Sequence, residues 1–390
     1  MIYRTLGNTG LKVSAIGLGA EHVTFEGYDE ICRVIDKCIG AGINYFDFFM
    51  AAPNVRTQFG QALGSRRKDI ILAVHMGSIW EDEQYKWSRD YDLCVEYIED
   101  FYERLNTDCI DMFILHLVDD LSDFETVMGE NHFYGYAMKL KKEGRIRFVG
   151  ISTHSVSVAL AAVNSKKLDL IEFPVNPIFD TFEGDLAIEY LFSDEAYADL
   201  KDAKIENQRI KLYRYCEQMG MPIAAIKIFA GGQLLRQNNF SGLTLTPVQA
   251  VSYALSRPGV STVLPGLKDV HELDEVLRYL DATDEEKDFS VINTSEHWDF
   301  TGQCTYCNHC LPCPSRINIG AVTRFFDSAK SYMSDELISD YDKLEIKPDK
   351  CIKCGDCESR CPFGVSAKEN MASCVELFKK QEKKELKGLL

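Results

Sequence analysis

The sequence predicts an α/β fold, a (β/α)8 TIM barrel followed by a small, all-helical, cysteine-rich domain. Over residues 1–283, short apolar runs alternate eight times with amphipathic stretches, the pattern of a parallel sheet closed into a barrel. Beyond the last repeat, cysteines concentrate between residues 304 and 361. No G-x-G-x-x-G opens a first helix, which weakens the alternative of an open doubly wound sheet.

The eight apolar runs are the expected strands, and the stretches between them are the expected helices. Apolar residues in these stretches recur at steps of three and four, as in Cys94, Ile98, Phe101 and Leu105. The segment 177–205 exceeds an ordinary βα loop, and we expect it to cover part of the barrel mouth. The expected strands occupy residues 15–19, 43–46, 70–74, 110–115, 146–151, 170–173, 222–226 and 261–264.

The cysteine-rich segment contains two runs, each followed by proline. Three thiolates spaced two residues apart let a tight loop wrap three corners of an iron-sulfur cube. Residues 284–299 are polar and are predicted to link the barrel to this domain, which spans residues 300–390. Residues 319–341, between the runs, have helical character, which favours an all-helical ferredoxin-like domain. The runs are Cys304-x2-Cys307-x2-Cys310-x2-Cys313-Pro314 and Cys351-x2-Cys354-x2-Cys357-x3-Cys361-Pro362.

The spacing predicts two [4Fe-4S] clusters with crossed ligation, because in two-cluster ferredoxins the fourth cysteine of each run ligates the other run's cluster. Structural zinc also uses C-x2-C pairs, but it gains nothing from a third cysteine in step or from the proline. A disulfide framework fits worse in a chain of this size without a secretory signal. The expected ligand sets are Cys304, Cys307, Cys310 and Cys361 for one cluster, and Cys351, Cys354, Cys357 and Cys313 for the other.

The composition limits the classes of binding partner and the cellular compartment that we expect. The net charge of −17 argues against nucleic acid or an anionic membrane surface. No run of about 18 apolar residues appears, and the N-terminus has no apolar signal region. The six cysteines outside the two runs have apolar neighbours and are expected to be reduced core thiols. We therefore expect a cytoplasmic redox protein that acts on a small molecule or on a redox partner protein.

Ionisable side chains follow several of the expected strands. Chemistry in a (β/α)8 barrel belongs at the carboxyl ends of the strands, where side chains from different strands converge. Facing groups perturb each other's pKa values, so a ring of them indicates function. Histidines would act as general acid or base, and a carboxylate would orient them. The strand-end residues are Asp47, His75, His116, Ser152, Thr153, His154, Glu172, Asn176, Lys227 and Gly266, with His22 in the first loop.

Five segments at these positions resemble the aldo/keto reductases over roughly residues 1–280. They are residues 6–14, 42–47, 111–116, 149–152 and 264–266. With the cysteine domain, the chain resembles the bacterial branch of that superfamily that carries a C-terminal ferredoxin domain. The resemblance implies a (β/α)8 barrel, and the best-known members reduce carbonyls with NADPH.

The chain departs from the family at the catalytic tetrad of aspartate, tyrosine, lysine and histidine. Asp47 and His116 match the first and the last. Ala52 stands in place of the tyrosine, and His75 in place of the lysine, so the usual proton donor and the cation that tunes it are both absent. The resemblance therefore predicts Asp47, His75 and His116 as the catalytic residues.

The nucleotide site implied by the resemblance is also altered. The glutamine that packs on the nicotinamide aligns with Glu172, and the stacking tyrosine aligns with Ile226. Acidic neighbours of Lys268 would repel a 2′-phosphate, so NADPH specificity is not supported, and NADH or no nicotinamide remain open. The candidate cofactor-binding residues are Ser152, Asn176, Gly266 and Lys268.

The sequence leaves three alternative functions. The first is an enzyme that passes electrons between the clusters and a small organic substrate at the barrel mouth, with substrate choice set by loops 76–92, 119–135 and 177–205. The second is an electron-transfer module whose barrel is a scaffold for a redox partner protein. The third is an iron(II) site formed by His75, His116 and Asp47.

Overall fold

The computed structural model describes residues 1–181, 184–185, 208–237, 243–294, 302, 304, 310–331 and 333–388. Most of the predicted insertion at 177–205 lies outside these residues. So do residues 295–299 of the predicted linker, and Cys307 of the first cysteine run.

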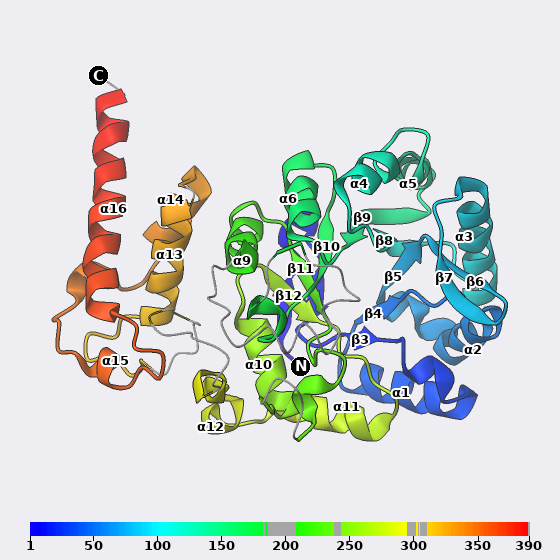
Figure 1. Ribbon diagram of the computed structural model, residues 1–390, viewed down its shortest axis with the longest axis horizontal. Helices are drawn as coiled ribbons and strands as arrows, with labels where there is room; N and C mark the ends of the chain where they lie inside the picture. Colours follow the sequence, from blue (N-terminus) through cyan, green and yellow to red (C-terminus); the bar gives the residue numbers. More distant parts are fainter. Residues whose placement is uncertain are drawn as a thin grey trace.

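The central element is an eight-stranded parallel sheet that closes into a barrel (Figure 1). Neighbouring strands pair in the order β12-β11-β10-β9-β8-β5-β4-β3. Parallel bridges from Ile16 to Val263 and from Gly19 to Gly266 join the two edge strands. All eight predicted strands are present, and the barrel prediction is confirmed. Their bounds are β3 (Leu18–Gly19), β4 (Tyr45–Phe48), β5 (Ile71–Met76), β8 (Ile110–Leu115), β9 (Ile146–Ser152), β10 (Leu170–Pro174), β11 (Ile223–Ile226) and β12 (Val260–Val263).

Two glycines allow the first strand to meet its neighbours at this seam. A Cβ on Gly17 would lie 2.8 Å from the carbonyl oxygen of Tyr45, and one on Gly19 would lie 2.9 Å from that of Pro265. Both distances are shorter than a van der Waals contact, so a side chain at either position would push the backbones apart. Residues 15–19 therefore join both neighbouring strands, β4 on one side and β12 on the other.

Helices follow the strands and cover the outside of the barrel (Figure 1). The first of them buries Ile31, Val34, Ile35 and Cys38, the three-and-four spacing of an amphipathic helix. A capping box between Thr246 and Gln249 starts the helix after β11. The helices are α1 (Tyr28–Gly40), α2 (Pro53–Leu63), α3 (Tyr91–Leu105), α4 (Leu121–Val127), α5 (Phe133–Lys142), α6 (Val156–Ser165), α9 (Gln208–Gln218), α10 (Pro247–Ser256) and α11 (Val270–Leu277).

Alternation along the strands stacks side chains inside the barrel, because residues i and i+2 face the same way. An apolar layer fills the interior. The inward rows of β4, β5, β8 and β10 continue two residues later into a polar residue at the carboxyl end of the strand. The apolar layer includes Leu6, Val13, Tyr45, Ile71, Ala73, Met112, Ile114, Leu170, Ala224 and Leu264.

Two hairpins are added to the barrel. Strands β1 (Tyr3–Thr5) and β2 (Lys12–Ser14) pair at the amino-terminal side and contribute Leu6 and Val13 to the interior. Strands β6 (Ser78–Glu81) and β7 (Gln84–Trp87) pair directly after β5, within the loop assigned to substrate choice. The second hairpin lies at the carboxyl ends of the strands and matters for the site.

The described residues beyond the barrel are helical, as predicted (Figure 1). Arg214 of α9 pairs with Asp327 at 2.9 Å, and Arg324 donates to Glu217 of α9. The helix that carries Asp327 and Arg324, α13 (Ile319–Ser331), therefore packs on α9. Among the helices that the structure describes, none combines the length and apolarity needed to cross a membrane. The helices are α12 (Asp284–Lys287), α13 (Ile319–Ser331), α14 (Asp335–Asp342), α15 (Asp356–Ser359) and α16 (Ala367–Gly388).

The described part of the predicted linker packs on the barrel. Phe289 and Ile292 are 2% and 0% exposed, and Gln249 of α10 donates a hydrogen bond to the carbonyl of Asp288 at 2.7 Å. These two apolar residues attach the chain to α10 before it reaches the cysteine runs.

Candidate active site and cluster-binding region

Four polar residues form a layer above the apolar interior. Asp47 lies two residues after Tyr45 on β4, His75 two after Ala73 on β5, and Glu172 two after Leu170 on β10. His116 directly follows β8, two residues after Ile114. All four are between 1% and 6% exposed. The sequence predicted three of these as catalytic, and the structure brings all three together with Glu172.

The four side chains are connected through His75. Its Nε2 lies 2.8 Å from Oδ1 of Asp47 and 3.2 Å from Oε2 of Glu172. Its Nδ1 lies 2.8 Å from Nδ1 of His116. The two ring nitrogens of His75 therefore face opposite partners, with carboxylates on one side and a second imidazole on the other.

Charge and burial set the protonation of these groups. Burial alone would lower the pKa of His75, but the carboxylates of Glu172 and Asp47 reverse this and raise it to about 10. Burial and the positive charge of His75 lower the pKa of His116 well below its usual range. Burial and Asp47 raise the pKa of Glu172 to about 7. Near neutral pH, His75 is therefore an imidazolium and His116 is neutral.

The phenol that reaches His116 comes from the β6–β7 hairpin. The hydroxyl of Tyr85 lies 2.6 Å from Nε2 of His116. The ring of Phe49 stacks on His116 with centroids 5.6 Å apart and meets Tyr85 edge-on at 5.5 Å. Ala52, at the family's tyrosine position, is 1% exposed and begins α2. Sequence reasoning missed Tyr85, because its role depends on how the hairpin folds over the mouth.

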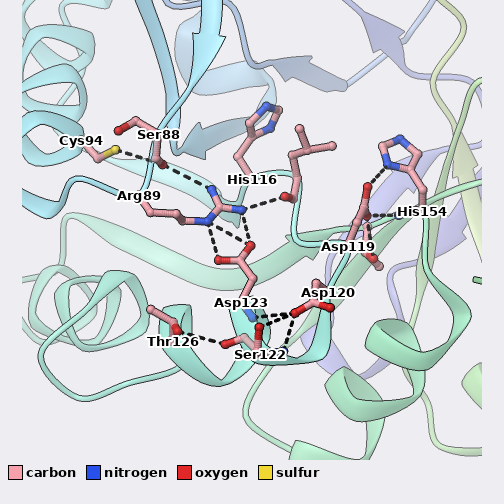
Figure 2. Close-up of polar contacts among 12 residues, drawn as sticks. Ser88, Arg89, Cys94, His116, Asp119, Asp120, Ser122, Asp123, Thr126 and His154 are labelled. Atoms are coloured by element: carbon pink, nitrogen blue, oxygen red, sulfur yellow. Dashed lines mark hydrogen bonds and ion pairs between the residues drawn. The ribbon is translucent and has the colours of Figure 1, made fainter. Parts of the chain in front are cut away.

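Arg89 anchors the hairpin to the loop after β8 (Figure 2). Its guanidinium donates to both carboxylate oxygens of Asp123 at 2.6–3.0 Å and to the carbonyl of Leu117 at 2.7 Å. Bidentate pairs of this kind fix geometry as well as charge. At the other end of the hairpin, Gly77 has φ +111°, a conformation that favours glycine.

A second histidine–carboxylate pair lies at the end of β9 (Figure 2). His154 Nδ1 lies 2.8 Å from Oδ2 of Asp119, whose other oxygen accepts from the backbone of His154 at 2.6 Å. Burial lowers the pKa of His154, although Asp119 opposes the shift. Neutral His154 donates from Nδ1, and its buried Nε2 has no hydrogen-bond partner among the described residues. That nitrogen can accept a hydrogen bond from a substrate donor.

The iron(II) set of His75, His116 and Asp47 does not converge on one point. His75 uses Nε2 toward Asp47 and Nδ1 toward His116, so one ion could not contact all three. Asp47, His75 and Glu172 do place one ligand atom each within 4.8 Å of one another. The hydrogen-bond distances on this side of His75 are those of an imidazolium shared by two carboxylates.

Of the four nucleotide candidates, Ser152 pairs in register with Glu172 of this layer, and Asn176 and Lys268 contact other residues. Asn176 accepts from the backbone of Phe179 at 2.8 Å and donates to the carbonyl of Lys227 at 2.9 Å, so it braces two loops. The Nζ of Lys268 is 3.6 Å from Glu272. Gly266 bridges to Gly19, and Ser152 ends β9. Binding of a nicotinamide by these residues stays a prediction.

The second cysteine run forms an enclosed site with one residue of the first. Cys313 lines one cavity with Cys351, Cys354 and Cys357, and the apolar residues Ile317, Ile319 and Met371 complete the wall. Four thiols around one cavity with an apolar wall fit a [4Fe-4S] cluster. Crossed ligation of two clusters stays a prediction.

Two further cysteines of the runs lie against the barrel. Cys304 and Cys361 pack on a buried apolar group that we call the interface core. Arg360 donates to the carbonyls of Cys310 and Pro312 at 2.9 and 2.7 Å, which holds the two runs together. The interface core comprises Ile178, Phe179, Ala230, Leu234, Leu243, Leu245, Ala250, Tyr253, Phe289, Ile292, Phe363 and Val365.

Fold and site define the class, a (β/α)8 oxidoreductase with an iron-sulfur binding motif. The chain belongs to the aldo/keto reductase family, whose model matches residues 15–243. A 4Fe-4S binding domain matches residues 343–366, which include the second cysteine run. The family resemblance and the prediction of an oxidoreductase are thus confirmed.

Individual relatives agree with this assignment. An uncharacterized oxidoreductase, YqkF, of Bacillus subtilis is 27% identical over 290 residues, which cover 72% of this chain and 91% of the relative. L-galactose dehydrogenase of Arabidopsis thaliana is 31% identical over 159 residues, which cover 38% and 47%. The structure of aldo-keto reductase AKR11C1 from Bacillus halodurans superposes with a TM-score of 0.54 at 23% identity, covering 74% of this chain and 94% of that one.

Proposed function

We propose that this protein is an iron-sulfur oxidoreductase in which electrons pass between two [4Fe-4S] clusters and a small organic substrate at the barrel mouth. The expected ligands are Cys304, Cys307, Cys310 and Cys361 for one cluster, and Cys313, Cys351, Cys354 and Cys357 for the other. When bound, such clusters supply or accept single electrons.

The observation that carries the proposal is the position of Cys304 and Cys361 against the interface core. Ile178 and Phe179 lie in the loop after β10, and Ala230 lies in the loop after β11. These loops leave the carboxyl ends of the strands, where the site of a (β/α)8 enzyme is formed. A cofactor held by the first run would therefore lie on the same side of the barrel as the mouth, with the interface core between the two.

The residues of the mouth handle protons and position the substrate. The family's tyrosine and lysine are replaced by Ala52 and His75, so His75 supplies the positive charge in this layer. The Nε2 of His154, which has no hydrogen-bond partner among the described residues, orients a substrate that carries a hydrogen-bond donor. Substrate choice falls to the β6–β7 hairpin and to the loop of residues 119–135.

One observation favours an electron-transfer module as the second candidate. Ile352, between two ligands of the second-run site, is 67% exposed, and Cys354 is exposed as well. An exposed apolar side chain beside a redox centre suits the docking of a redox partner protein. In this reading the barrel is a scaffold and the mouth has no turnover of its own.

The deciding experiment supplies electrons from dithionite-reduced methyl viologen to the anaerobically purified protein, with a panel of aldehydes, ketones and quinones as acceptors. Cys354→Ala, which removes a ligand of the second-run site, is expected to abolish viologen-dependent turnover. Cys32→Ala, on α1 and far from both runs, is the matched control and keeps it. Full turnover in Cys354→Ala would reduce the cysteine domain to a structural role. Wild-type protein that exchanges electrons with viologen but reduces no acceptor would favour the electron-transfer module.

A further inference from the structure

A continuous chain of hydrogen bonds leads from the buried carboxylates to the surface. It runs from Asp47 and Glu172 to His75, from His75 to His116, and from His116 to Tyr85, with contacts of 2.6–3.2 Å. Exposure rises along it, from 1% at Glu172 and 3% at His75 to 37% at Tyr85. Its outer end is therefore the phenol of the hairpin.

With His75 charged, these contacts set the direction in which the protons point. A doubly protonated His75 donates from Nε2 to the carboxylates and from Nδ1 to His116. Nδ1 of neutral His116 must then be the acceptor, so the proton of His116 is on Nε2 and is donated to the oxygen of Tyr85. The hydroxyl hydrogen of Tyr85 is then not used in the contact with His116 and is available to a substrate oxygen.

We propose that Tyr85 is the proton donor to the substrate, and that His116 and His75 form a proton wire that reprotonates it. The proposal rests on the proposed function and adds to it the residue that gives up the proton. The substrate considered is a carbonyl compound, as for the best-known members of the family, and its oxygen gains negative charge as it is reduced.

The step balances as follows. Reduction of a carbonyl to an alcohol takes up two electrons, from the iron-sulfur clusters, and two protons. Tyr85 gives its proton to the carbonyl oxygen, Nε2–H of His116 reprotonates the phenolate, and Nδ1–H of His75 reprotonates His116. Water supplies the proton that ends on carbon. The net change in the wire is one proton lost from His75, which is regained from solvent through Tyr85 after the product leaves.

The surroundings support transfer along the wire rather than leakage from it. Phe49 covers one face of His116 and meets the rings of His75 and Tyr85 at 5.9 and 5.5 Å. Beneath the carboxylates, the described side chains of the barrel interior are apolar apart from the buried hydroxyls of Tyr45 and Thr262. A proton on His75 therefore leaves through His116.

The other charged groups that face the wire favour this order of protonation. Arg89 and Lys227 add positive charge near His116 and keep it neutral. Burial raises the pKa of Tyr85 to about 12, Glu21 reinforces the shift and Arg89 opposes it. The phenol is therefore protonated at neutral pH and ready to donate.

The first test needs no substrate. In the oxidised holoprotein labelled with 15N-histidine, NMR near neutral pH is expected to show His75 protonated on both nitrogens and His116 in the Nε2–H form, with assignments from His75→Gln and His116→Gln. Asp47→Asn combined with Glu172→Gln should return the pKa of His75 to an ordinary or lower value. A neutral His75 near neutral pH, an Nδ1–H tautomer at His116, or a chelator-sensitive metal on His75 would overturn the wire.

The second test uses the viologen-linked assay on whichever carbonyl the wild type reduces. Tyr85→Phe should lower kcat by about 100-fold or more, the size of a lost general acid, with the cluster EPR signals unchanged. Tyr28→Phe, an exposed tyrosine on α1, is the matched control and should retain wild-type kcat. Unchanged kcat in Tyr85→Phe refutes the donor, whereas a wild type without cluster-dependent turnover refutes the proposed function and leaves the NMR result to decide the wire.

Discussion

Cys313→Ser tests the crossed arrangement of the two cysteine runs. Cys313 belongs to the first run in sequence but lines the cavity of the second, with Cys351, Cys354 and Cys357. The substitution removes one of four thiolates from that site and none from the site of Cys304 and Cys310. Two clusters contain about eight irons per chain, so loss of one cube leaves about four, and conversion to a three-iron form leaves about seven.

The assay is iron and sulfide analysis of the anaerobically purified variant, with EPR of the reduced protein to identify the cluster that changed. Cys361→Ser is the reciprocal variant, and it should damage the cluster next to the interface core instead. Cys32→Ser, on α1, should keep the full iron content. Loss of the first-run cluster in Cys313→Ser, or stoichiometric zinc in the wild type, would refute the crossed assignment.

Three further predictions concern the barrel. Arg89→Met removes the contacts to Asp123 and Leu117 that hold the hairpin, so kcat should fall with the cluster signals unchanged, whereas a normal kcat would show that the hairpin positions itself. Calorimetric titration should find weak binding of NADPH and no preference for it over NADH, since Lys268 already faces Glu272, and a tight NADPH site would contradict this. The folded-state pKa of His75, about 10, exceeds its unfolded value near 6.5, so the stabilisation it contributes is complete below pH 6.5 and is lost as pH rises through 10. The advantage of the wild type over His75→Gln in thermal unfolding should therefore shrink between these pH values, and a constant difference would refute the linkage.

The barrel could be predicted because its strands are buried on both faces and therefore appear as apolar runs. The hairpin of β6 and β7 could not, because it lacks the usual turn signal. Its two turn residues, Asp82 and Glu83, have φ of +52° and +58°, values for which Asn-Gly or Asp-Gly would be typical. With no glycine in the turn, the sequence predicts only a loop over residues 76–92 and does not single out Tyr85.

The strand ends illustrate the same limit. Position after a strand predicted that Asp47, His75 and His116 would meet, because parallel strands share one carboxyl edge. It could not distinguish them from Asn176, which also follows a strand. The side-chain amide of Asn176 forms its hydrogen bonds with the backbone of Phe179 and Lys227. Which polar groups remain available depends on how loops are braced, and that depends on contacts between residues far apart in sequence.

The absence of the family's tyrosine at position 52 suggested that the proton donor was lost. In the proposed mechanism, a position in an alignment is a poor guide to such a role, since His116 needs only a phenol within reach of Nε2 and Tyr85 lies within 2.6 Å of it from a different element. The replacement of lysine by His75 can be explained in the same way, by the contacts that each side chain can make. A lysine would place its charge at the tip of a flexible chain, whereas an imidazolium has two opposed donors and can contact carboxylates and His116 at once. Asp47 and Glu172 keep that imidazolium charged, which is the condition for the wire to point toward Tyr85.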